Sequence, residues 1–120
     1  MNNAAGFTEV IEVSTGDQFC ATNNIDEIDL LKIDTEGYEM PVLQGFSNML
    51  KHSKINAVYC EVGFNPVNKK NTYINEVIDF ANQNGFQFYG LYDLANFQIS
   101  NGLNFGNILF LSNDIVKKLL

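Results

Sequence analysis

The spacing of hydrophobic positions along the chain changes several times between the alternation of a strand and the period of a helix. Two segments have helical spacing: one runs from about Glu39 to Lys51, and the other from a cap at Asn71–Thr72 to a stop at Asn84–Gly85. Residues 15–24 look like a loop with one helical turn, and the last eight residues like a terminal helical turn. Strands are predicted at residues 8–13, 28–34, 55–64, 86–94 and 107–112.

The predicted order is strand, helix, strand, helix, strand, strand. Two successive βαβ units with right-handed crossovers give a mostly parallel sheet with helices on its faces. The last connection is short and carries the turn signal Asn101–Gly102, which permits an antiparallel last strand. We therefore predict an α/β fold that corresponds to half of a doubly wound sheet.

Acidic residues follow the ends of two neighbouring strands. Asp34 and Glu36 close the strand at 28–34, and Glu61 lies near the end of the next one. Ligands of open α/β sheets gather at the carboxyl ends of the strands, and adjacent strands lie ~4.8 Å apart. These carboxylates could therefore face one crevice and serve as an acid–base or hydroxyl-orienting set.

Structural interpretations of the same residues remain open. Lys32 and Asp34 could form an ion pair at the rim of the sheet, and Glu36 could be an acid favoured by a helix start. Gly37 could either permit a sharp turn or let a ligand approach the backbone. Another hypothesis is a hydrolase that holds Mg²⁺ with Asp34, Glu36 and Glu61.

Composition narrows the classes of partner. The 120 residues carry a formal net charge of −7, which argues against nucleic acid and anionic membranes and favours a small or neutral substrate. No apolar tract is long enough to span a bilayer, and the first residues lack a signal-peptide pattern. Cys20 and Cys60 show no metal-ligand spacing, so we expect reduced packing cysteines in a cytoplasmic protein.

The stretch "IDLLKIDTEGYEMPVLQG" at 28–45 resembles the central signature of the FkbM-type methyltransferases, in which an apolar strand runs into Lys-Ile-Asp-x-Glu-Gly-x-Glu and then a helix with Val-Leu-x-Gly. Downstream, "AVYCEV", "ANQNGFQFYGLYDL" and "GNILFLS" resemble later strands and the last helix of that family. Upstream, "VSTGDQF" resembles a Thr-x-Asp segment in which Asp17 is the matching acid. Gly16 stands where the family usually has a larger apolar residue.

The resemblance implies S-adenosylmethionine as cofactor and an O-methyltransferase that acts on a hydroxyl of a sugar, polysaccharide or related metabolite. By position, Asp34 is expected on the cofactor and acceptor side, with Gly37 beside the cofactor. Glu61 is expected at the acceptor, and Glu36 is a third catalytic candidate. Lys32 would tune Asp34 electrostatically.

The resemblance covers the second half of the family domain. No G-x-G turn is present, so residues 1–120 are expected to form a single partial domain, the C-terminal half of a Rossmann-like class I methyltransferase fold without its glycine-rich cofactor-binding half. The strand at 28–34 would then have an edge that is open or covered only by 8–13. We expect self-association through this edge, or a missing half supplied in trans. The alternative function is a non-catalytic half-domain that binds another chain there.

Overall fold

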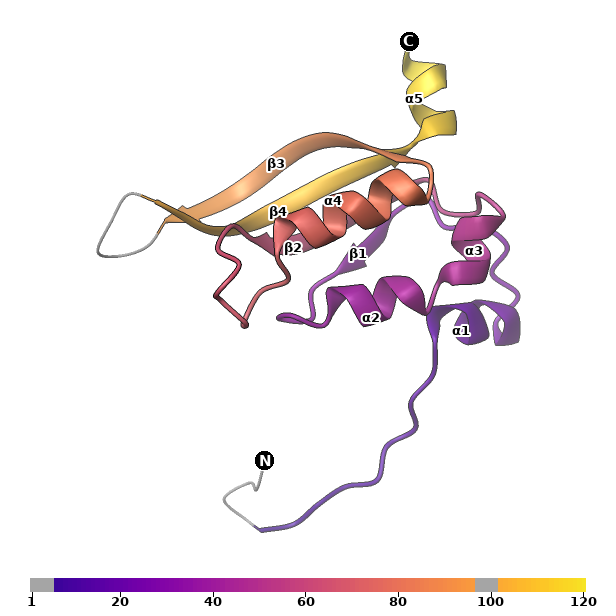
Figure 1. The fold of residues 1–120 in the computed structure, drawn as a ribbon. Helices are drawn as coiled ribbons and strands as arrows, with labels where there is room; N and C mark the ends of the chain where they lie inside the picture. Colours follow the sequence, from indigo (N-terminus) through magenta and orange to yellow (C-terminus); the bar gives the residue numbers. More distant parts are fainter. Residues whose placement is uncertain (1–5, 97–101) are drawn as a thin grey trace.

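The computed structural model describes residues 6–96 and 102–120, which form one mixed sheet with helices packed against it (Figure 1). The sheet has four strands in the order β1-β2-β4-β3. β1 and β2 are parallel, whereas β4 is antiparallel to β2 and to β3. The strands span Leu31–Ile33 (β1), Ala57–Gly63 (β2), Phe86–Asn96 (β3) and Leu103–Ser112 (β4).

The α/β class and the antiparallel last strand are confirmed, but the sheet is less parallel than predicted. Because β4 enters between β2 and β3, only the pair β1–β2 is bonded in parallel. The strands β1, β2 and β3 still run in one direction, since β3 and β2 both oppose β4. The directions of β1, β2 and β3 therefore agree with two successive βαβ units. Because β4 lies between β2 and β3, these two strands do not pair with each other.

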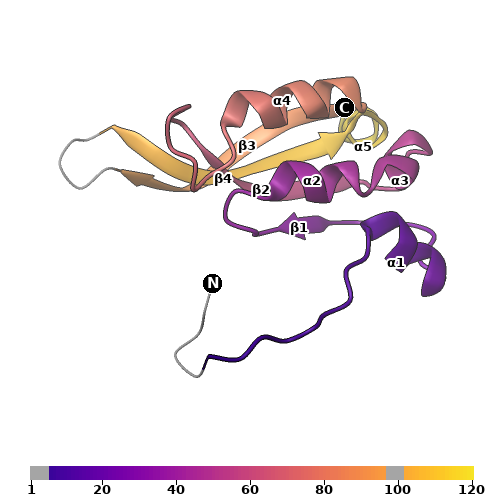
Figure 2. The same ribbon diagram turned by 60° about the horizontal axis from the view of Figure 1, so that its bottom comes forward.

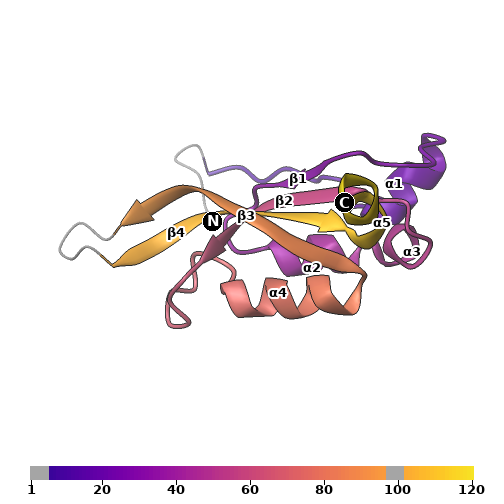
Figure 3. The ribbon, with the colours of Figure 1, turned by 90° about the horizontal axis from the view of Figure 1, so that it is seen from above.

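The helices are α1 (Gly16–Thr22), α2 (Glu39–Gln44), α3 (Ser47–Lys51), α4 (Ile74–Gln83) and α5 (Asn113–Leu119). Figures 1 and 3 show α2 and α4 on the same side of the sheet. The prediction that helices lie on the faces of the sheet is therefore wrong for α2 and α4, which share one face. From β1 to β2 and on to β3 the chain moves across the sheet in one direction, so two right-handed crossovers must fall on one face.

The helix predicted from Glu39 to Lys51 is two helices, because a residue distant in sequence starts the second. The carboxylate of Asp17 accepts hydrogen bonds from the backbone N–H groups of Asn48 (2.7 Å) and Met49 (3.0 Å) at the first turn of α3. The N–H of Asp17 in turn donates to the carbonyl of Gly45 at 2.9 Å. Asp17, the acid matched upstream of the signature, thus caps α3 and links it to α1.

The predicted strand at residues 8–13 is wrong. This segment is extended and lies away from the sheet (Figure 2), with Val10 99% and Val13 87% exposed. It does not cover β1, which among the described residues has a bonded neighbour on one side only. Residues 15–24 are more regular than expected, since Thr15 caps α1 by accepting a hydrogen bond from the N–H of Gln18.

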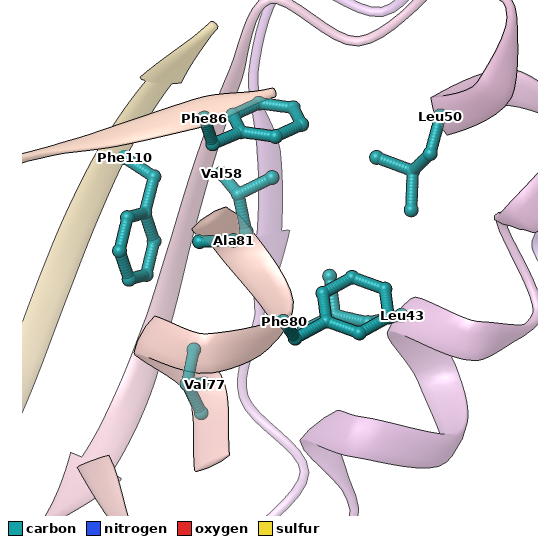
Figure 4. A pocket seen from close by; sticks show the side chains of 8 residues that line it. All are labelled: Leu43, Leu50, Val58, Val77, Phe80, Ala81, Phe86 and Phe110. Atoms are coloured by element: carbon teal, nitrogen blue, oxygen red, sulfur yellow. The ribbon is translucent and has the colours of Figure 1, made fainter. Parts of the chain in front are cut away.

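The core lies between the sheet and the helices. Its apolar side chains surround a narrow gap with room for about 10 Å³, which has no polar wall to hold a water (Figure 4). We interpret this gap as imperfect packing and not as a ligand site. The lining residues are Leu43, Leu50, Val58, Val77, Phe80, Ala81, Phe86 and Phe110.

Cys20 and Cys60 are buried and unpaired, as expected of packing residues. Burial, followed by the negative charge of Glu39, raises the pKa of Cys60 to about 12, so its thiol stays protonated at neutral pH. Within residues 6–96 and 102–120, no helix has both the length and the apolar character needed to cross a membrane.

Candidate functional site

The turn that follows β1 carries three of the predicted site residues, Asp34, Glu36 and Gly37. Glu36 and Gly37 both have left-handed backbone angles, with φ of 51° and 100°. A Cβ on Gly37 would lie 3.2 Å from the carbonyl oxygen of Lys70 and 3.3 Å from that of Lys69. Glycine is therefore needed here both for the turn and for the close approach of a second loop, which follows β2.

Glu39, at the start of α2, is only 1% exposed, and its carboxylate holds this turn in place. Its Oε2 accepts hydrogen bonds from the N–H of Thr35 (2.8 Å) and from the hydroxyl of Thr35 (2.6 Å). Its Oε1 accepts from the N–H of Gly37 (3.0 Å) and from the hydroxyl of Thr72 (2.7 Å). The sequence matched Glu39 to a family signature without giving it this role.

Opposing effects act on the pKa of Glu39. Burial alone would raise the pKa, but the hydrogen bonds from Thr35, Thr72 and the N–H of Gly37 together lower it below the ordinary value of 4.5. Glu39 is therefore ionised at neutral pH. It is a fixed anion that orders the protein around it, because its oxygens already accept hydrogen bonds from within the chain.

Glu61 lies near the end of β2 and behaves in the opposite way. Its pKa is raised, first by burial and then by the negative charges of Asp34, Glu39 and Glu36, while a hydrogen bond from Asn71 partly offsets the rise. The Nδ2 of Asn71 donates to Oε1 of Glu61 at 2.6 Å. Asp34 and Glu36 are thus close enough to Glu61 for their charges to act on it.

The predicted site residues divide between two hollows. Glu36 and Glu61 line an open cleft of about 590 Å³ together with Asn68, Lys70, Asn71, Asn104 and Phe105. Gly37 lines a neighbouring pocket of about 340 Å³ instead. Asp34 lines neither of these two hollows and reaches the cleft only through its charge on Glu61.

An asparagine network on the cleft wall was not predicted. The Nδ2 of Asn68 donates to Oδ1 of Asn71 (3.2 Å) and to Oδ1 of Asn104 (3.3 Å). The Oδ1 of Asn68 accepts from the N–H of Lys70 at 3.0 Å. The one sequence signal was the spacing of asparagines by three in "NPVNKKN" at 65–71, and Asn104 is brought to them by the fold.

The geometry gives little support to the two alternative interpretations, an ion pair between Lys32 and Asp34 and a magnesium-dependent hydrolase. Lys32 is exposed, and the described part of the chain contains no ion pair between it and Asp34. Among residues 6–96 and 102–120, no group of three or more His, Cys, Asp and Glu side chains is arranged to hold a metal ion. The geometry therefore does not support the rim ion pair or the magnesium-dependent hydrolase.

Comparison with known families decides the class. A family model described as the methyltransferase FkbM domain matches residues 4–88, which include the turn after β1 and all of β2. The chain belongs to the FkbM methyltransferase family. Searches of curated proteins and of solved structures gave no match. The resemblance seen at 28–45 is thus confirmed, whereas the idea of a non-catalytic interaction module receives no support.

Proposed function

We propose that this FkbM-family chain contributes the acceptor side of an O-methyltransferase that uses S-adenosylmethionine and methylates a hydroxyl of a sugar, polysaccharide or related metabolite. The observation that carries the proposal is the cleft of about 590 Å³, whose wall holds Glu36 and Glu61. Its size is in the range of small-molecule sites. The sheet would be the C-terminal half of a Rossmann-like fold.

Glu61 has the properties of a group that receives a proton from the acceptor. Its raised pKa brings its proton affinity closer to what general-base chemistry near neutral pH requires. Asn71 holds one carboxylate oxygen at 2.6 Å, which leaves the other for a hydroxyl group. Glu61 would take the hydroxyl proton as the methyl carbon forms its bond to the acceptor oxygen and its bond to sulfur breaks, which leaves a neutral thioether, and Glu36 would orient the acceptor from the opposite loop.

The residues around the turn fit the cofactor by their chemistry. S-adenosylmethionine supplies an electrophilic methyl group on a positively charged sulfur, and it also carries an ammonium group and ribose hydroxyls. Carboxylates are suitable partners for such cations and hydroxyls. Asp34 and the backbone at Gly37 are the groups we assign to it, because Asp34 is exposed at the end of β1 and Gly37 lines the neighbouring pocket.

The acceptor class is proposed from the cleft wall. Asn68, Asn71 and Asn104 present amide groups, which donate and accept hydrogen bonds and so match the hydroxyls of a sugar. Phe105 adds an apolar surface beside them, against which the carbon face of a sugar ring could pack. A neutral polyhydroxylated acceptor also agrees with the net charge of −7, which disfavours anions.

Calorimetric titration of S-adenosylmethionine into the purified chain tests the proposal. We expect micromolar binding that is lost in Asp34→Ala. Asp79→Ala is the matched control, since Asp79 is an exposed aspartate on α4, outside both hollows. Absence of heat with the unaltered chain would contradict cofactor binding by this chain, and equal binding by both variants would contradict the role given to Asp34.

A further inference from the structure

The walls of the cleft come from two loops that are far apart in sequence. Glu36 belongs to the turn after β1, whereas Asn68, Lys70 and Asn71 belong to the loop after β2. Their backbones approach closely at Gly37, where a Cβ would meet the carbonyl oxygens of the second loop. The shape of the cleft therefore depends on what holds these two loops together.

We infer that Glu39 is a positioning residue whose buried carboxylate joins the two loops and thereby sets the arrangement of Glu36 and Asn71 across the cleft. On the first loop, Glu39 accepts from both donors of Thr35 and from the N–H of Gly37, which lie on either side of Glu36 in the sequence. On the second loop, it accepts from the hydroxyl of Thr72, the residue after Asn71. Its catalytic relevance rests on the proposed function.

The second loop carries the constraint on to Glu61. The carbonyl of Thr72 accepts a hydrogen bond from the N–H of Gly63 at 2.7 Å, which fixes the loop to the end of β2. Next to it, Asn71 donates to Glu61 at 2.6 Å. Two hydrogen bonds, joined by the peptide bond between Asn71 and Thr72, therefore connect Glu39 to the carboxylate that we assign to the acceptor.

Only an ionised carboxylate suits the position of Glu39. Each of its oxygens accepts one backbone N–H and one hydroxyl. In a glutamine, the NH₂ group would have to face either the N–H of Thr35 or the N–H of Gly37. A hydroxyl can rotate and accept, but a backbone N–H cannot. In either orientation, Glu39→Gln therefore places a side-chain NH₂ donor against a backbone N–H donor, with almost no change in side-chain volume.

Nuclear magnetic resonance of the full chain tests this inference on Glu39→Gln and Thr72→Val. The readouts are hydrogen exchange at the N–H of Gly37 and the side-chain amide signals of Asn71. We expect exchange at Gly37 to become at least tenfold faster in Glu39→Gln, and the Asn71 signals to move toward those of a free asparagine in both variants. Glu12→Gln is the control, because Glu12 is an exposed glutamate of the extended segment before α1 and lines neither of the two hollows.

Thr72→Val separates the link between the loops from the charge, since it keeps the Glu39 carboxylate and removes one donor. If the connection from Glu39 to Glu61 runs through Asn71, Thr72→Val will weaken the hydrogen bond from Asn71 to Glu61. Because this hydrogen bond lowers the pKa of Glu61, its loss will raise that pKa further. An unchanged Asn71 signal and an unchanged Glu61 pKa in folded Thr72→Val would overturn the inference. This holds even if Glu39→Gln does not fold.

Cofactor titration of the same variants keeps the two proposals apart. If the unaltered chain binds S-adenosylmethionine, we expect at least tenfold weaker binding in Glu39→Gln and no change in Glu12→Gln. If the unaltered chain shows no binding, the proposed function fails for this chain, and the resonance measurements still decide the role of Glu39. Tight binding by a folded Glu39→Gln with an intact Asn71 signal would contradict the positioning role.

Discussion

The contact between Gly16 and Phe46 gives a sharp test of the packing around α1. A Cβ built on Gly16 would lie only 2.2–2.4 Å from three atoms of the Phe46 ring, which is far inside van der Waals contact. Phe46 is 9% exposed and belongs to the hydrophobic core. The ring therefore occupies the space in which the larger apolar residue usual in the family would place its side chain.

Replacement of Gly16 by leucine should therefore destabilise the chain. The ring of Phe46 must leave its place, and full burial of such a side chain contributes about 1.5–3 kcal/mol. Overpacking of a dense core costs about 1–3 kcal/mol, and the better helix propensity of leucine returns less than about 1 kcal/mol. We expect Gly16→Leu to lower the free energy of unfolding by about 1–3 kcal/mol. Ala21→Leu, at an exposed position of α1, should change it by less than about 0.5 kcal/mol.

A double-mutant cycle identifies the cause of the loss. Phe46→Ala alone should cost about 3–5 kcal/mol, because it leaves a cavity. In Gly16→Leu/Phe46→Ala the leucine can fill that cavity, so the combined loss should be smaller than the sum by at least about 1 kcal/mol. Urea denaturation followed by circular dichroism measures all four proteins. Gly16→Leu with unchanged stability, or strictly additive losses, would refute the interpretation that Phe46 takes the place of the missing side chain.

Two further predictions concern Glu61 and the edge of the sheet. Because folding raises the pKa of Glu61, the stability linked to its protonation is present below its ordinary pKa of 4.5 and is lost as pH rises through the folded pKa. At pH 7, Glu61→Gln should therefore have a higher melting temperature than the unaltered chain in calorimetry. Below pH 4 this difference in melting temperature should be smaller, and an equal difference at both pH values would contradict the reasoning. Since β1 lacks a second neighbour among the described residues, the chain should associate with rising concentration in sedimentation experiments, and a sharply melting monomer throughout would count against this.

The elements that the sequence predicted best are those with strong local periodicity. The strands at 55–64 and 86–94 and the helix that became α4 appear close to their expected positions, whereas the strand at 107–112 begins earlier, at Leu103. The segment at 8–13 has an alternating pattern but no partner strand in the described structure, and an extended segment needs a partner to form a sheet. The break between α2 and α3 depends on Asp17, 31 residues before Asn48, and no local pattern contains that information.

The candidate site was predictable where strand direction determines it. The placement of Glu36 and Glu61 on one cleft follows from their positions after β1 and near the end of the parallel strand β2, whereas Asp34 lines neither hollow. The role of Glu39 could not be predicted in this way, because three of its four donors lie in its own turn but the fourth comes from Thr72. The asparagine network likewise depends on how a loop after β2 meets β4.

Glu39 and Glu61 differ in kind because their surroundings move their pKa values in opposite directions. Hydrogen bonds to Glu39 outweigh its burial and lower its pKa, so it remains charged and fully bonded. Burial and neighbouring carboxylates raise the pKa of Glu61, whose carboxylate accepts one hydrogen bond within the described residues, from Asn71. Pairs of carboxylates separated in this way are the usual basis for assigning different roles. The ionised Glu39 also contributes to the raised pKa of Glu61, so the acid that holds the turn also increases the proton affinity on which the proposed role of Glu61 depends.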